Sequence, residues 1–430
     1  MEKSQDKGRI TTIIACFIMV MSTLGFASGT KTLFPDEVSR ALDIERSLFS
    51  ITETCRYVTT AIINLFFGTL MRKFGAKKLI CAGFISIIAS MLMYSAANSL
   101  LPIYIAGCLL GLGISWTSTT MVGNIVEGWG LKNKGAMMGA ILASNGVGGA
   151  IAIQIVGGLI DPATVGSYRR AYRAIAIALV IALALVIILM REKYARCEVG
   201  KKHPKKNSAG ASWEGLALSQ ALKKWYFWAM LVCIFFSGMI IQGTHGIVAM
   251  HMKDVGVDYS RVKALLSFGF LILSSAKVLA GFVYDKLGLR TTASICMCIS
   301  VVSSVLLASV KGGDVGFVIA IIYVILSQFA MPLETVMLPL YASDLFGSRD
   351  YPHILGIFVS VNMAGFSVGA PVMNLCFDIC HSYVPAIIAV GVMMAIMLVL
   401  IQFAIPSAHR ERDKKSSYNG IKSTISSQHS

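Results

Sequence analysis

Apolar runs of about 20 residues, each long enough to cross the hydrocarbon core of a bilayer as a helix, recur along the whole chain. They limit the fold severely, because a backbone inside lipid must satisfy its hydrogen bonds within helices or closed barrels. Only 14% of the 430 residues are charged, whereas a soluble domain carries about 25%. We therefore expect an all-α membrane protein.

The first run, at about residues 10–34, follows the polar stretch MEKSQDKGR and could be taken for a secretory signal. It is longer than the roughly 7–15-residue core of a signal, and it lacks a clean small-x-small cleavage site. We therefore expect it to remain as a membrane span.

Twelve spans are predicted, six in each half of the chain. They lie at about 10–34, 47–70, 78–98, 100–126, 135–160, 169–190, 225–248, 261–284, 291–310, 315–342, 353–377 and 383–405. We expect four parts: an N-terminal six-helix bundle (1–190), a basic cytoplasmic linker (191–224), a C-terminal six-helix bundle (225–406) and a disordered cytoplasmic tail (407–430).

The basic residues indicate the orientation of these spans. Most of the 38 Lys and Arg residues fall in the inner segments if both termini are cytoplasmic, as the positive-inside rule requires. The same bias accounts for the net charge of +16 without a nucleic-acid partner. We expect a monomeric, multi-pass protein of the cell (plasma) membrane, in contact with lipid.

The two halves carry matching stretches. GTLMRKFGAKK (Gly68–Lys78) and GFVYDKLGLRT (Gly281–Thr291) have glycines and basic residues at the same spacing, 213 residues apart (281 minus 68). A looser match pairs GGLIDPATVGSYRRA with NLCFDICHSYVPA. Two matches after corresponding helices indicate a six-plus-six duplication, which is how many secondary transporters are built.

The two stretches also resemble the signature loop of the major facilitator superfamily, Gly-x-x-x-Asp-[Lys/Arg]-x-Gly-x-[Arg/Lys]. In that family the Asp pairs with loop cations and a helix N-terminus to hold one conformation closed. The first copy departs from the pattern because Arg72 stands at the acidic position, which implies a weaker latch in the N-terminal half. The resemblance implies a conformational gate formed by Gly68, Arg72, Gly75, Gly281, Asp285, Lys286, Gly288 and Arg290.

A subgroup resemblance rests on NIVEGWGLKNKGAMMGAILASNGVGGAI and on SYVPA at the start of the twelfth span. These stretches are similar to the Trp-containing loop, the Gly-rich fifth helix and the twelfth helix of monocarboxylate and oxalate:formate transporters. The resemblance implies exchange or proton symport of a small organic anion.

Lys277 is the main candidate for the substrate site. Members of this subgroup carry a cation, usually Arg, four residues before the glycine of the second signature, and Lys277 stands four residues before Gly281. It lies roughly 12 Å from the inner end of its span at 1.5 Å per residue. A charge at that depth is expected to face a wet cavity or an anion. The alternative is a lysine that snorkels along lipid to the interface.

Two departures from the subgroup bear on the substrate. Proton-coupled monocarboxylate transporters carry an Asp four residues before the cation, where this chain has Leu273. Oxalate exchange is associated with a second cation in the eleventh helix, where only Asn362 is found. Because a second carboxylate without a cation is costly to desolvate, one central cation favours a monocarboxylate.

Polar residues in the first two spans suggest a further wall of the cavity. Glu53 and Arg56 are three residues apart and can pair on one helix face. Arg56 and Asn64 lie on one polar stripe, and Asn64 is the repeat counterpart of Lys277. Lys31 lies near a lysine typical of some monocarboxylate carriers, with the register one residue off. Each of these could equally be an interfacial or structural residue.

Three groups are candidates for proton coupling: Glu334, which lies between two prolines, Glu53 and His245. Gln242, near His245, could bind the second oxygen of a carboxylate. For His245 and Glu334 a purely structural role is the alternative. The ten cysteines lack the spacing of a zinc site, so we expect no metal and no cofactor.

These observations predict a non-enzymatic secondary transporter of a small organic anion, of the formate, lactate or pyruvate class, with protons as a second partner if it is a symporter. Alternatives are an oxalate or dicarboxylate antiporter, an efflux carrier for amphipathic compounds, and a membrane anion sensor that does not transport. The sequence contains no nucleotide-binding loop or nucleophile elbow that would indicate an enzyme.

Overall fold

The structure is a computed structural model, and it describes residues 2–428 except 45, 130–132, 161–163, 165, 191–214, 257–258 and 312. Most of the predicted linker 191–224 therefore lies outside the described residues. The described secondary structure is entirely helical.

The N-terminal half contains α1 (Glu2–Val20), η1 (Met21–Ser28), η2 (Lys31–Leu33), α2 (Pro35–Leu42), α3 (Arg46–Leu65), α4 (Phe67–Phe74), α5 (Ala76–Ala96), α6 (Leu100–Thr117), α7 (Thr119–Glu127), α8 (Lys134–Gly157) and α9 (Tyr168–Leu189). The C-terminal half contains α11 (Leu218–Ala221), α12 (Trp225–Asp254), α13 (Tyr259–Ser309), α14 (Asp314–Ala330), α15 (Pro332–Thr335), α16 (Met337–Phe346), α17 (Tyr351–Cys380) and α18 (Val384–Gln428).

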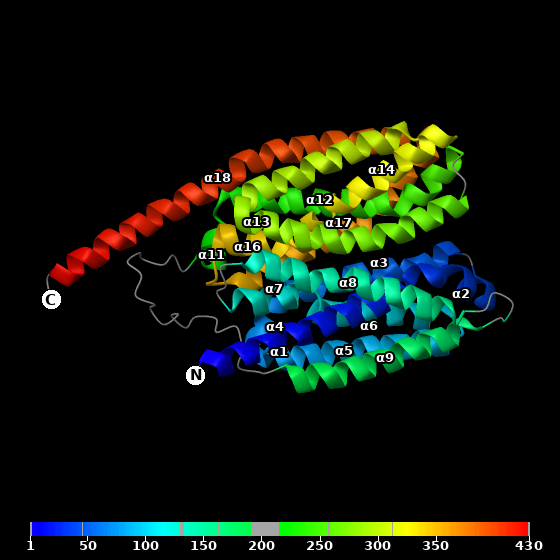
Figure 1. Ribbon diagram of the computed structural model, residues 1–430, viewed down its shortest axis with the longest axis horizontal. Helices are drawn as coiled ribbons and strands as arrows, with labels where there is room; N and C mark the ends of the chain where they lie inside the picture. The colour runs from blue at the N-terminus through cyan, green and yellow to red at the C-terminus, as the bar shows by residue number, and fades with distance from the viewer. Residues whose placement is uncertain are drawn as a thin grey trace.

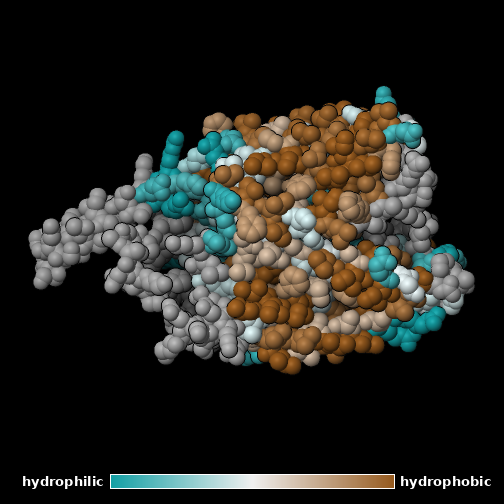
Figure 2. Space-filling model, in the orientation of Figure 1, coloured by the Kyte–Doolittle hydropathy of each residue, from teal (hydrophilic) through white to brown (hydrophobic). Residues whose placement is uncertain are grey.

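The helices form two bundles that lie side by side, one from each half of the chain, with both termini at the same end (Figure 1). The outer surface carries a broad apolar band, with hydrophilic residues gathered at the two ends of the bundles (Figure 2). Since a contiguous apolar surface of this extent is unfavourable in water, the band indicates the lipid-facing surface.

Ten stretches within the described residues are long and apolar enough to cross a membrane. One of them, Phe268–Ser309, covers 42 residues because α13 continues through a kink at Gly288, where two predicted spans meet. The predicted second span corresponds to α3 and α4, which join at Phe66. The chain is thus a multi-pass helical membrane protein.

The sequence repeat has a counterpart in the backbone. Gly75 has φ 77° and ψ 165°, and Gly288, at the matching position of the second copy, has φ 78° and ψ 175°. Such positive φ values favour glycine, because a Cβ would clash with the backbone. The two signature loops therefore make the same turn in both halves.

The last helix differs from its sequence-based expectation. The sequence predicts a disordered tail over 407–430, but α18 continues as a helix to Gln428 and extends beyond the bundle (Figure 1). Its first polar turns are anchored: His409 and Arg412 contact Asp344 on α16 at 2.9 and 3.3 Å, and Glu411 contacts Lys224 at 2.7 Å. Burial alone would raise the pKa of Asp344, but the hydrogen bond and charge of His409, with Arg412 and Lys134, hold it below its ordinary value.

Glycines bring the two bundles into close contact along α8 and α13. A Cβ on Gly139 would lie 2.4 Å from the backbone oxygen of Lys277, and one on Gly281 would lie 2.2 Å from the oxygen of Gly135. Small residues at such positions let helices approach closely in lipid, where the gain comes from packing. The helix that carries Lys277 is therefore pressed against the opposite half.

We expect Gly139→Ala to lower the free energy of unfolding by about 1–3 kcal/mol, because the added methyl group forces the two backbones apart. Thermal unfolding of the purified protein in detergent measures this effect. Gly158→Ala is the matched control, since a Cβ there meets its nearest atom at 3.4 Å, an ordinary contact. Equal stability of the two variants would contradict the packing account.

Candidate functional site

The ammonium group of Lys277 is buried between the two bundles. The residue is only 2% exposed, so it does not snorkel to an interface. Its Nζ lies 3.4 Å from the backbone oxygen of Leu142 on α8. With the amide of Asn145 turned so that it donates to Leu24 at 3.2 Å, the Asn145 oxygen accepts from Lys277 at 3.3 Å. Elements of both halves, α13 on one side and α8 and η1 on the other, thus surround the group.

The partners of Lys277 among the described residues are neutral oxygens at the long end of hydrogen-bond distance, 3.4 and 3.3 Å from Nζ. No carboxylate of the described chain forms an ion pair with it. An ammonium group has three donors, and a buried charge without a counter-charge is costly. The arrangement suits a ligand that brings a negative charge and strong acceptor oxygens to Nζ.

Arg56 is also buried, but it is already neutralised. Its Nη2 pairs with Glu53 at 2.7 Å, its Nη1 donates to Ser28 at 2.7 Å, and its guanidinium lies 4.5 Å from the ring centre of Tyr57. Glu53 also accepts from Lys31 at 2.9 Å. We call Lys31, Glu53 and Arg56 the ion cluster; two cations and one acid leave it with one net positive charge.

The two predicted asparagines have hydrogen-bond partners other than Lys277. Asn64 is fully buried in the N-terminal half, where its amide donates to Thr60 at 2.8 Å and its oxygen accepts from Thr120 at 3.0 Å. Asn362, also fully buried, donates to Ile234 on α12 at 3.3 Å and interacts with Glu334. Gln242 is half-buried on α12. The substrate-binding roles of these residues stay predictions.

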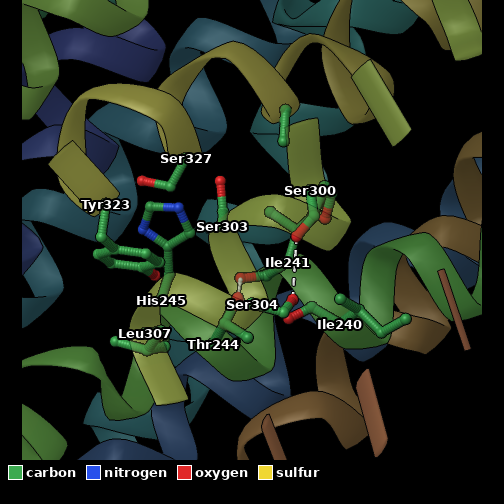
Figure 3. A pocket seen from close by; sticks show the side chains of 11 residues that line it. Ile240, Ile241, Thr244, His245, Ser300, Ser303, Ser304, Leu307, Tyr323 and Ser327 are labelled. Atoms are coloured by element: carbon green, nitrogen blue, oxygen red, sulfur yellow. Dashed lines mark hydrogen bonds between the residues drawn. The ribbon is translucent and has the colours of Figure 1, made fainter. Parts of the chain in front are cut away.

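His245 lines a small cavity inside the C-terminal bundle, together with several serines and apolar side chains (Figure 3). The cavity of about 20 Å³ has room for a water molecule but not for an organic acid. Its walls come from α12, α13 and α14. The imidazole lies beside Tyr323, Ser303 and Ser327, and Lys31 is close enough to act on it electrostatically.

Glu334 lies on α15 and is 4% exposed, and its Oε1 has no hydrogen-bond partner among the described residues. No described cation forms an ion pair with Glu334, just as no described acid forms one with Lys277. Glu53 differs from Glu334 because two cations already hold its carboxylate ionised.

The signature loops connect the two bundles at the end where both chain termini lie. Asp285 accepts from the backbone N–H groups of Gly135 and Ala136 at 3.0 and 2.7 Å, at the N-terminus of α8. In the first copy, Arg72 contacts the imidazole of His353 on α17. Arg290 donates to Gln402 at 2.6 Å, and Lys286 is exposed. Both loops thus join the two halves, through different chemistry.

A sequence model of the Major Facilitator Superfamily matches residues 13–250 and 230–428. The chain belongs to this superfamily. It is a transporter of the major facilitator type, in agreement with the resemblance seen in its signature loops.

Individual superfamily members are similar over nearly the whole chain. An uncharacterised transporter of this type, YcxA of Bacillus subtilis (strain 168), is 24% identical over 94% of this chain and 98% of its own length. Solved structures with the same fold include the Escherichia coli fucose:proton symporter FucP (14% identity, TM-score 0.64, 93% of this chain and 99% of that one). The human organic anion transporter MFSD10 (9%, TM-score 0.68, 93% and 99%) and the proton:xylose symporter XylE (11%, TM-score 0.69, 92% and 96%) are further examples.

Two residues of the site are not evident from the sequence. Asn145 stands beside a glycine run that predicts only close packing, and no spacing pattern marks it as a partner of Lys277. Arg72 stands at the position of the missing loop acid, and its partner His353 lies 281 residues away in the sequence. The one available signal for Asn145 is that it is the amide nearest the middle of the predicted fifth span.

A double-mutant cycle should give Glu53 and Arg56 a coupling energy of about 1 kcal/mol or more, because removing Glu53 leaves a buried cation unpaired. Glu53→Gln, Arg56→Gln and the double variant are compared by unfolding in detergent. The control is the Glu37–Arg40 pair on α2, which has the same i,i+3 spacing but an arginine that is 58% exposed, and it should couple by less than about 0.5 kcal/mol. Equal coupling in the two pairs would contradict the described burial of Arg56.

Proposed function

We propose that this chain is a secondary active transporter of a small organic anion, and that the ammonium group of Lys277 binds the carboxylate. The observation that carries the proposal is the burial of Lys277 between the two halves, where the described residues offer its Nζ two long contacts, both to neutral oxygens. A carboxylate would supply the missing charge and charge-assisted hydrogen bonds. Its binding would neutralise the ammonium group of Lys277, which otherwise stays charged between the two halves when they move relative to each other.

The charges nearby favour a monocarboxylate of the formate, lactate or pyruvate class over oxalate. The ammonium of Lys277 is a single positive charge, and Arg56 is engaged by Glu53 and Ser28. Asn362, at the position associated with a second cation, interacts with Ile234 and Glu334. A second carboxylate would therefore be desolvated without a partner, at a cost that a monocarboxylate avoids.

The ion cluster supports the same substrate class. Its net positive charge lies on η2 and α3, where Lys31 and Glu53 are about one third exposed. Such a charge attracts anions and raises their local concentration at a cleft. We propose that it guides the acid toward Lys277 and closes behind it as part of the gate.

The proposed architecture is twelve transmembrane helices in two six-helix halves, with N- and C-termini cytoplasmic, in the plasma membrane. The kink of α13 and the α3–α4 pair account for the two predicted spans that have no separate apolar stretch. Alternating access would proceed by rocking of the halves about Lys277. The contacts of Asp285 with α8 and of Arg72 with His353 would close the cytoplasmic side.

Two of the structural relatives are described as proton symporters and one as an organic anion transporter. Their likeness to this chain concerns the fold alone. The anion class proposed here rests on Lys277 and the ion cluster, and the relatives show that the fold suits small solutes.

Counterflow in proteoliposomes tests the proposal. Vesicles are preloaded with unlabelled formate, lactate, pyruvate or oxalate, and entry of the labelled acid is followed. We expect exchange of a monocarboxylate, and a loss of about tenfold or more in apparent affinity with Lys277→Ala, because a charged hydrogen bond is removed. Lys277→Arg should retain part of the activity, since it keeps the charge.

Lys223→Ala is the matched control, because Lys223 is an exposed lysine of the same half. Robust oxalate exchange would contradict the single-cation argument and redirect attention to Arg56 and Lys31. Absence of counterflow with every acid, by protein that is folded, would overturn the organic-anion proposal and favour efflux or sensing.

A further inference from the structure

Asn145 is the only side chain within the described part of the chain that has a hydrogen bond to the ammonium group of Lys277. Its oxygen accepts from Nζ at 3.3 Å, and its nitrogen donates to the backbone oxygen of Leu24 at 3.2 Å. The other partner of Nζ, at 3.4 Å, is the backbone oxygen of Leu142, which a change of side chain does not remove. Asn145 is therefore the position at which side-chain chemistry sets what faces Lys277.

Two glycines hold Asn145 at the contact between the halves. A Cβ on Gly146 would collide with the hydroxyl group of Ser274 on α13, and one on Gly148 would collide with the backbone oxygen of Met21 in η1. Small residues at such positions let α8 approach α13 on one side and η1 on the other. Because both neighbours are this close, the short amide of Asn145 reaches α13 and η1 at once.

The amide of Asn145 is neutral, and this neutrality decides what Lys277 can bind. An amide oxygen accepts from one N–H of the ammonium group but leaves its charge uncompensated. A carboxylate at the same place would form an ion pair with charge-assisted hydrogen bonds, which are about twice as strong as neutral ones. Lys277 would then have its counter-charge within the protein, and an anion from solution would have to displace that carboxylate.

We propose that Asn145 is a positioning residue that determines the specificity of the anion site. Its oxygen holds the ammonium group of Lys277 between the halves before the acid binds, and gives way to the carboxylate of the acid. The inference rests on the proposed function, transport of a monocarboxylate bound at Lys277. The exchange of partners is non-covalent, because the Asn145 oxygen leaves Nζ as a carboxylate oxygen arrives, and all protons stay on Nζ. A neutral amide at this position reserves Lys277 for solutes that bring their own negative charge.

A role in packing alone would have different consequences. If Asn145 only joined α8 to η1, replacing its amide by a carboxylate of the same size would lower the stability of the fold and the transport rate together. If Asn145 positions Lys277, the new ion pair leaves the fold at least as stable and removes affinity for the anion. Thermal stability and substrate affinity, measured on the same variant, therefore separate the two roles.

The first arm of the test compares lactate counterflow by wild-type protein and Asn145→Asp in proteoliposomes, with equal pH on both sides. Asn145→Asp should raise the apparent KM for lactate about tenfold or more, with a much smaller change in the maximal rate, because the internal carboxylate competes with the acid for Lys277. The melting temperature of the variant in detergent should be unchanged or higher.

Asn98→Asp is the matched control for the first arm. It adds the same charge beside a cation, Arg169, but outside the contact between the halves, and should leave the apparent KM unchanged. Wild-type affinity in Asn145→Asp would overturn the inference. A loss of affinity accompanied by a lower melting temperature would also overturn it, in favour of a packing role.

The second arm begins without substrate. Solid-state NMR of the protein in bilayers, with ¹⁵N-lysine and ¹³C-asparagine, should contain a dipolar contact between an asparagine side-chain carbon and a lysine Nζ that is missing in Asn145→Leu and in Lys277→Gln. Saturating lactate should weaken this contact, because the carboxylate takes the place of the amide oxygen. A spectrum without the contact, or a contact that transported lactate leaves unchanged, would overturn the inference. The contact in a protein that transports no acid would support the positioning of Lys277 by Asn145 and count against the proposed substrate.

Discussion

The ammonium group of Lys277 lies where two helices from opposite halves meet, and its lack of a counter-charge governs the account given above. A lysine on a lipid-facing surface could extend to the interface, but this one is 2% exposed and is held against α8. The glycines of α8 bring the two backbones together, so the charge cannot be relieved by moving the helices slightly apart. The carboxylate of the transported acid is therefore the simplest remaining source of a counter-charge for Lys277.

The ionisable groups of the interior divide into three kinds. The ion cluster of Lys31, Glu53 and Arg56 compensates one of its two positive charges, so it can be buried in part. Lys277 and Glu334 are each single ionisable groups without an ion-pair partner among the described residues, one at the contact between the halves and one inside the C-terminal bundle. Because a carboxylate that crosses the membrane can neutralise Lys277, the contact between the halves suits movement of an anion.

Much of this arrangement follows from local sequence. The apolar runs predict the helices, and the i,i+3 spacing predicts the Glu53–Arg56 pair. A lysine inside an apolar run is costly to bury, so its position alone indicates a candidate binding site. The matched glycines predict equal turns, and Gly75 and Gly288 have nearly equal φ values.

Contacts between distant segments could not be predicted in this way. Lys31 joins Glu53 from another helix, His353 meets Arg72, and Asn145 meets Lys277 across the two halves. Each depends on the rotation of one helix against another, which the period of apolar residues fixes only loosely. The helical course of α18 beyond residue 407 depends likewise on the contacts of His409 and Arg412 with Asp344.

The central claim, that a carboxylate binds at Lys277, is tested most directly by solid-state NMR of the protein in bilayers. The lysines carry ¹⁵N and the bound lactate carries ¹³C at its carboxyl group, so that a dipolar contact reports their proximity. The account predicts one contact to a lysine Nζ, lost in Lys277→Gln. Bound lactate without a contact to any lysine nitrogen, or a contact that survives in Lys277→Gln, would contradict it.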